Sequence, residues 1–84
     1  MSRIKLIWDF RGHNAQKIAE HHAVHLREFA QAEGLENTLC ETTQLTQMHT
    51  IAFLVVEESK MNELRERLKP HRGQRYQEPP PEER

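Results

Sequence analysis

The sequence predicts an α+β fold of the ferredoxin-like type, a two-layer sandwich in which two helices cover one face of an antiparallel sheet. Two observations predict it. Apolar residues alternate with a period of two in some segments and follow a helical period in others, and these segments succeed one another in the order β-α-β-β-α, with a final β left open. The two most apolar strand segments are the first and the third, which this architecture places at the centre of the sheet.

The 84 residues are enough for one small domain. Residues 1–77 are expected to form that domain, and the charged, proline-rich segment 78–84 is expected to be a disordered tail. A lone hydrophobic core of this size is thin. We therefore expect the domain to gain stability from a partner, a metal ion or a second copy of the chain.

The first strand and the first helix are expected in the N-terminal half. Apolar side chains alternate with mostly polar ones from Arg3 to Phe10, which is typical of a strand with one apolar face. Gly12 then supplies a turn, and Gly34 is expected to end the helix that follows. The apolar stripe of that helix consists of Ala15, Ile18, Ala19, His22, Leu26, Phe29 and Ala30.

The second half of the chain contains the remaining elements. The segment Asn37–Thr46 is rich in threonine and weakly apolar, which favours an edge strand. Thr50–Val56 is apolar on both alternating faces and belongs at the centre of a sheet. Ser59 is a suitable N-cap for a second helix, which Pro70 ends. Residues 74–77 could form a short last strand.

The sheet face away from the helices is predicted to be apolar as well. It would carry Ile7 and one alternating set of the third strand, either Ala52, Leu54 and Val56 or Ile51, Phe53 and Val55. An exposed apolar sheet face is normally an interface. We therefore expect a homodimer, packed sheet to sheet or joined along an edge strand.

Composition excludes several classes of protein. Twelve Lys and Arg residues nearly balance thirteen Asp and Glu residues, for a net charge of -1, so we expect no nucleic-acid partner. No apolar stretch approaches the ~20 residues that span a bilayer, and we expect no membrane partner. A single cysteine, Cys40, excludes a disulfide within the chain and a multi-cysteine zinc site. Because no signal-peptide pattern follows Met1, the prediction is a cytoplasmic protein.

Three of the six histidines lie within residues 20–25. His21 and His25 have the i, i+4 spacing that places two imidazoles on one helix face, where they could bind a divalent metal ion such as zinc. Partly solvated histidines without a ligand are the alternative. The zinc-protease motif needs glutamate directly after its first histidine, and His22 stands in that place. His22 is expected either to form a hydrogen bond with the sheet or to line a site.

A second candidate site depends on the fold. The predicted topology brings the end of the first strand close to the start of the third strand and the end of the second helix. Arginine binds phosphate or carboxylate through paired hydrogen bonds, and a carboxylate can orient an imidazole. Ordinary polar loop residues are the alternative. The residues gathered at this end are Asp9, Arg11, His13, His49, His71 and Arg72.

Three functions stay open at this stage. The first is a homodimeric binding module that holds a metal ion or a small anion through its histidines and arginines. The second is a small dimeric α/β-barrel enzyme in which His22 or His49 acts as the acid–base group. The third is a structural protein-interaction domain. The sequence does not decide whether the chain is an enzyme.

Overall fold

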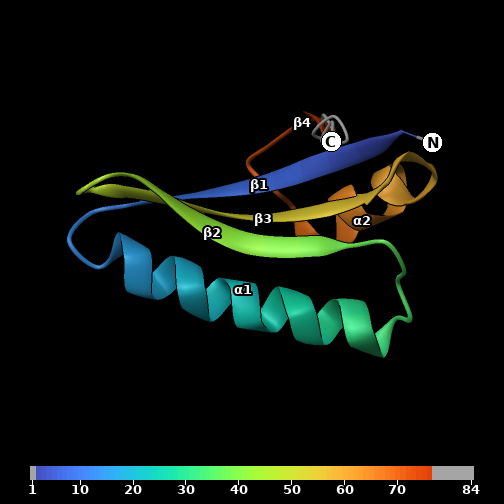
Figure 1. The fold of residues 1–84 in the computed structure, drawn as a ribbon, viewed down its shortest axis with the longest axis horizontal. Helices are drawn as coiled ribbons and strands as arrows, with labels where there is room; N and C mark the ends of the chain where they lie inside the picture. Colours follow the sequence, from blue (N-terminus) through green and yellow to red (C-terminus); the bar gives the residue numbers. More distant parts are fainter. Residues whose placement is uncertain (1, 77–84) are drawn as a thin grey trace, which may run out of the picture.

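The computed structural model describes residues 2–76, so the tail predicted at 78–84, Met1 and Gln77 lie outside the described residues. The chain is an α+β protein, as predicted (Figure 1). Its elements are β1 (Arg3–Arg11), α1 (Ala15–Ala32), β2 (Leu39–Thr46), β3 (His49–Glu57), the 3-10 turn η1 (Glu58–Lys60), α2 (Met61–Leu68) and β4 (Arg72–Tyr76).

The four strands form one antiparallel sheet in the order β2-β3-β1-β4. The first and third strands pair with each other at its centre, as predicted, from Arg3 opposite Glu57 to Arg11 opposite His49. The final strand, left open by the sequence, exists and pairs with β1. The predicted edge strand β2 pairs with β3 alone and has an irregularity near its end.

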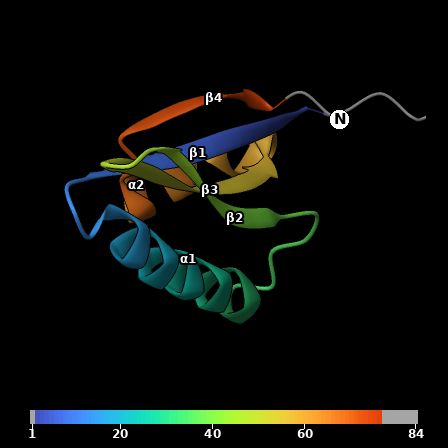
Figure 2. The same ribbon diagram turned by 60° about the vertical axis from the view of Figure 1, so that its left-hand side comes forward.

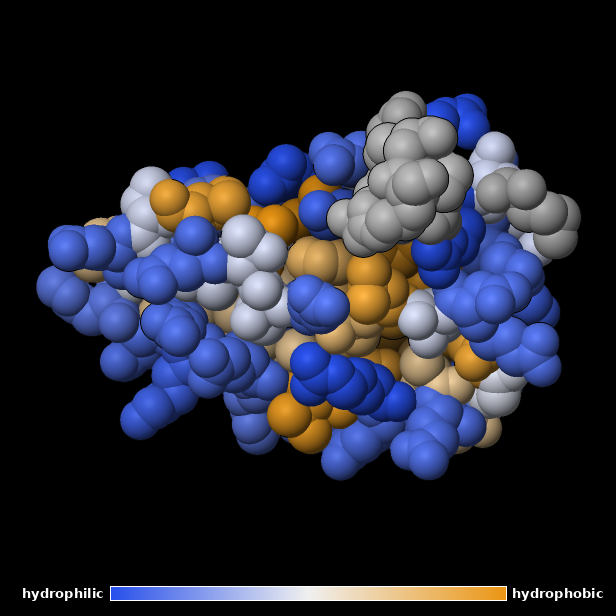
Figure 3. All heavy atoms as spheres, viewed as in Figure 1, coloured by the Kyte–Doolittle hydropathy of each residue, from blue (hydrophilic) through white to orange (hydrophobic). Residues whose placement is uncertain are grey.

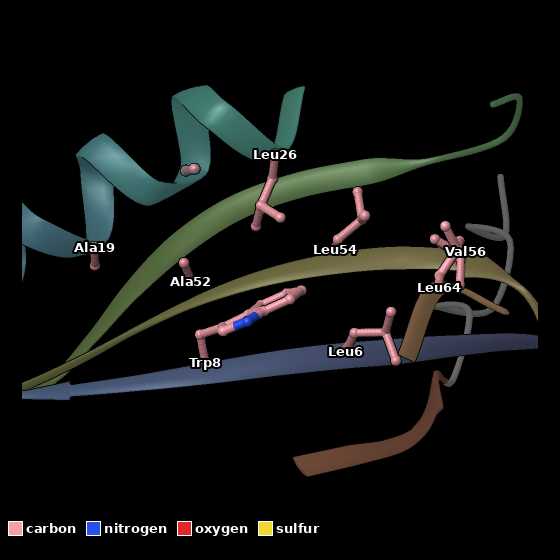
Figure 4. Packing of buried hydrophobic residues seen from close by; sticks show 9 residues of the cluster. Leu6, Trp8, Ala19, Leu26, Ala52, Leu54, Val56 and Leu64 are labelled. Carbon is pink, nitrogen blue, oxygen red and sulfur yellow. The ribbon is translucent and has the colours of Figure 1, made fainter. Parts of the chain in front are cut away.

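Both helices lie on the same side of the sheet (Figures 1 and 2). Small side chains on the buried face of α1 allow the helix to approach the sheet closely, and Figure 4 shows the side chains that fill the space. The indole Nε1 of Trp8 donates a hydrogen bond to the Leu68 carbonyl at the end of α2, 3.1 Å away. The buried cluster comprises Leu6, Trp8, Ala19, Ala23, Leu26, Ala52, Leu54, Val56 and Leu64.

The opposite face of the sheet, which we call the open face, carries a second apolar cluster. Of the two alternatives for β3, the set Ile51, Phe53 and Val55 faces this side together with Ile7. These four side chains are only 0–6% exposed, so the prediction that they are exposed is wrong. Longer neighbours help to cover them, since the Lys5 ammonium lies 4.2 Å from the centre of the Phe53 ring.

Three local predictions can be compared with the structure. Gly34 adopts a left-handed conformation (φ 67°) just after α1, as predicted. Ile18 was expected in the buried stripe but is 48% exposed, because the stripe centres on Ala19 and Ala23. The prediction that Ser59 caps the second helix is wrong: Ser59 lies within η1, and Lys60 precedes α2 without a side-chain cap. On the face drawn in Figure 3, hydrophilic side chains surround an apolar area.

Candidate functional site

The carboxylate of Asp9 lies at the centre of the candidate site. Asp9 Oδ1 accepts a hydrogen bond from His49 Nε2 at 2.7 Å and another from Arg72 Nη2 at 3.1 Å. Arg72 Nε donates to the other oxygen, Oδ2, at 2.9 Å. Arg72 thus binds the carboxylate in the two-pronged geometry that makes guanidinium–carboxylate pairs strong and directional.

Strand register explains why these residues meet. Side chains that lie opposite each other in an antiparallel ladder share a face, and Ile7, on the open face, lies opposite Arg72. Alternation along β1 then puts Asp9 and Arg11 on the open face, and Arg11 lies opposite His49. The site is therefore on the side of the sheet away from the helices. We call Asp9, Arg11, His49, His71 and Arg72 the Asp9 cluster.

Electrostatics keep Asp9 ionised. The hydrogen bond from Arg72 is the largest cause that lowers the pKa of Asp9 to about 2; burial opposes it, and the His49 hydrogen bond adds to it. In return, the Asp9 carboxylate raises the pKa of Arg72. The carboxylate and this guanidinium neutralise each other, so Arg72 positions Asp9 and does not offer a free positive charge.

His49 is held by Asp9 at one ring nitrogen and contacts Arg11 at the other. Because Nε2 donates to Asp9, the ring nitrogen Nδ1 carries a lone pair, and Nη1 of Arg11 lies 3.4 Å from it. This tautomer is assigned from the hydrogen-bond network. Arg11 is exposed and has no carboxylate partner among residues 2–76. Arg11 and His49 Nδ1 together form the side of the cluster that the Asp9 carboxylate does not bind.

His71 and His13 play different parts from those predicted. His71 Nδ1 accepts a hydrogen bond from the Asp9 backbone N–H at 2.8 Å, so His71 contacts the cluster through the backbone. Its ring also meets the edge of Phe10 on the other side of the strand. His13 is exposed in the turn before α1 and does not contact the cluster. Five of the six residues predicted at this end of the sheet are therefore brought together.

His22 lies on the helix side of the sheet and is not part of the Asp9 cluster. Its ring packs on Trp8 and Phe10, with ring centres 5.0 and 5.4 Å away. Its Nε2 is buried without a hydrogen-bond partner, so the hydrogen bond predicted between His22 and the sheet does not form at this nitrogen. Desolvation is the main cause that lowers the His22 pKa, and His25, His71 and His21 add to it.

The enzyme hypothesis based on His22 requires a pocket beside the ring. Three pockets found among residues 2–76 are lined by other residues. One of them, of about 310 Å³, lies between β1, α2 and β4, and sequence reasoning missed it because the last strand was left open. Gly73 lines it, and a Cβ there would make only ordinary contacts, the nearest at 3.7 Å.

The two predicted metal ligands lie side by side on the exposed face of α1. The Nε2 atoms of His21 and His25 are 3.0 Å apart. Within residues 2–76 no group of three or more His, Cys, Asp and Glu side chains is arranged to hold a metal ion. Glu28, which sequence reasoning did not single out, has Oε1 3.7 Å from Nδ1 of His25, and its i, i+3 spacing was the available signal.

Fold and site together define a small α+β sandwich with a cluster of charged and imidazole groups at one end of its open face. No family model, no curated protein and no solved structure matches this chain. None of the helices within residues 2–76 has the length and apolar character needed to cross a membrane. The function must therefore be inferred from the residues of the site.

Proposed function

We propose that this chain is a homodimeric binding module that holds a small anion, a carboxylate or a phosphate group, at Arg11 and His49. One observation carries the proposal: Asp9 fixes Nε2 of His49, while Nδ1 of the same ring lies 3.4 Å from the Arg11 guanidinium. An anion that lies beside these two groups would accept hydrogen bonds from both of them once Nδ1 carries a proton.

Anion binding is then coupled to proton uptake. In the neutral tautomer Nδ1 is an acceptor and would repel an anion, whereas the imidazolium donates from both nitrogens. Asp9 binds Nε2 of that ring, and Arg72 holds Asp9 in place. The side chains of Asp9 and His49 are only 16% and 14% exposed, so their interaction is weakly screened by solvent.

We also propose that the two-layer fold has ferredoxin-like topology. The argument is that β1 and β2 are joined through α1 while β3 lies between them, and β4 follows α2 to reach the outer side of β1. This is the arrangement expected of a β-α-β-β-α-β chain built from split βαβ units.

The proposed dimer rests on uncovered elements near the site. Among residues 2–76, β2 and β4 each pair with one strand, so each of them leaves one edge unpaired. Leu45 and Met48, at the β2–β3 turn beside His49, are 48% and 44% exposed. A second copy placed there would bury them and shield the anion from water. We keep the cytoplasm, expected from the sequence, as the proposed compartment.

Titration with inorganic phosphate, followed by NMR at pH 6 and pH 8, tests the anion site. We expect tighter binding at pH 6, with the largest shifts at Arg11 and His49. Arg11→Gln and His49→Gln should each weaken binding by tenfold or more (~1.4 kcal/mol). Arg75→Gln, which removes an exposed guanidinium from β4, is the matched control and should bind as the wild type does. Equal binding by all variants would exclude the site.

Sedimentation velocity over a range of concentrations tests the dimer separately. We expect a monomer–dimer equilibrium that Met48→Lys or Leu45→Lys shifts to monomer, because each places a charge in the proposed contact. Both side chains are exposed, so the substitutions should leave the fold intact. A monomer at all concentrations would rule out the dimer.

An enzyme that uses His49 as acid–base group is the second candidate. The observation that favours it is the Asp9–His49 pair, in which a carboxylate fixes the tautomer and leaves a lone pair on the accessible nitrogen. Such an enzyme would hydrolyse activated esters such as p-nitrophenyl acetate faster than free imidazole does. His49→Gln and Asp9→Asn should both lower that rate, whereas a binding module shows no such rate to lose.

A further inference from the structure

We propose that His21 and His25 form a clamp for a divalent transition-metal ion of the zinc, nickel or copper class. The clamp lies on the outer side of α1, whereas the Asp9 cluster lies on the open face of the sheet. It is therefore independent of the proposed anion site, and either of them can fail without the other.

The distance between the ring nitrogens carries the proposal. The two Nε2 atoms lie 3.0 Å apart. Ring nitrogens bound at about 2.0–2.1 Å to one ion lie roughly 2.8–3.4 Å apart for bond angles between about 90° and 109°. The pair thus already has the spacing of two neighbouring ligands, and binding an ion requires no rearrangement of the helix.

Protonation also favours an ion between the two rings. Two facing Nε2 atoms cannot both carry hydrogen, so at least one lone pair already points into the space between them. Glu28 Oε1 lies 3.7 Å from Nδ1 of His25, on the far side of that ring. A carboxylate in this position favours the proton on Nδ1, which leaves Nε2 of His25 free to bind the ion.

The surroundings define the kind of site. The His25 and Glu28 side chains are 60% and 69% exposed, so an ion can enter and leave directly from solvent. Since residues 2–76 supply no group of three or more such ligands, water completes the coordination shell. Imidazole ligands favour zinc, copper and nickel over magnesium and calcium, which prefer oxygen.

The third histidine of the run does not belong to the clamp. His22 packs inward against Trp8 and Phe10, while its neighbour His21 meets His25 with ring centres 4.6 Å apart. Adjacent residues of a helix are separated by about 100° around its axis. His22 therefore lies on a different side of α1 from His21 and His25. His22 serves as an internal reference for any measurement on the clamp.

Zinc titration of the full chain by calorimetry tests the proposal. We expect saturable binding that releases protons, detected as a dependence of the heat on the buffer. His21→Ala and His25→Ala should each lower the affinity by more than tenfold, and Glu28→Gln by about tenfold. His13→Ala, which removes an exposed histidine that lies outside both sites, is the matched control and should leave the affinity unchanged.

Imidazole nitrogen NMR of the wild-type chain provides a measurement that does not depend on variants. We expect zinc to shift Nε2 of His21 and His25 and to leave both nitrogens of His22 in place. Shifts confined to other histidines, or equal zinc affinity in the wild type and in His21→Ala, would overturn the proposal. Circular dichroism of each variant shows whether α1 is intact.

Discussion

The ring of His71 continues the β1–β4 ladder beyond the last paired residues of β4. The ladder ends at Ile7 opposite Arg72, yet the His71 backbone N–H still donates to the Ile7 carbonyl at 2.9 Å. Its Nδ1 then accepts the next backbone N–H, that of Asp9, at 2.8 Å. The His71 side chain thus takes the place of a backbone acceptor in the ladder. It holds the backbone of Asp9, the central residue of the candidate site.

We predict that His71→Ala lowers the free energy of unfolding by about 1 kcal/mol, because the Asp9 N–H loses its acceptor. Urea unfolding measures the change. Amide exchange should become faster at Asp9 and along β4, while β2 exchanges at the wild-type rate. His13→Ala, on an exposed residue, is expected to stay within about 0.5 kcal/mol of the wild type, and an equal loss in both variants would contradict the assignment.

Asp9→Asn should lower the free energy of unfolding by about 1–3 kcal/mol near neutral pH. The amide keeps the shape of the carboxyl group but loses its charge, so it cannot form the two-pronged ion pair with Arg72. Urea unfolding again gives the value. Arg72→Lys should cost less than Asp9→Asn because it keeps the charge and loses the two-pronged geometry; the reverse order would refute this account.

The stability that Asp9 contributes should disappear in acid. Its pKa is lowered from 3.8 to about 2 in the folded chain, so the unfolded chain binds more protons between these two values. Stability therefore rises with pH across this window, is fully present above about pH 4 and is lost as pH falls toward 2. The wild-type advantage over Asp9→Asn from this effect, at most about 2–3 kcal/mol, should be smaller in unfolding measured at pH 2 than at pH 4.5.

We predict that His22→Phe raises the free energy of unfolding by about 1 kcal/mol. Nε2 of His22 is buried without a partner, and a phenyl ring can keep the packing on Trp8 and Phe10 without burying an unpaired polar atom. Thermal unfolding of the variant measures the effect. A clear loss of stability would mean that this nitrogen has a partner in solution, such as an ordered water molecule.

The residues of the candidate site were predictable to different degrees. Asp9, Arg11 and His49 could be placed together because strand pairing in the predicted order leaves few registers for β1 and β3. The roles within the cluster could not be predicted. Arg11 and Arg72 lie on the same face as Asp9, and only the side-chain contacts of the folded chain decide that Arg72 pairs with the carboxylate while Arg11 lies next to His49.

By itself, the sequence determined the elements, their order and the two apolar faces of β3, because hydrophobic periodicity records which side of each element is buried. Only the tertiary structure decided which face of β3 meets the helices, that β4 forms, and that His22 packs on Trp8 and Phe10 without a hydrogen-bond partner at Nε2. These outcomes depend on contacts between residues far apart in the chain or on the rotation of α1 against the sheet, and no local pattern encodes either of them.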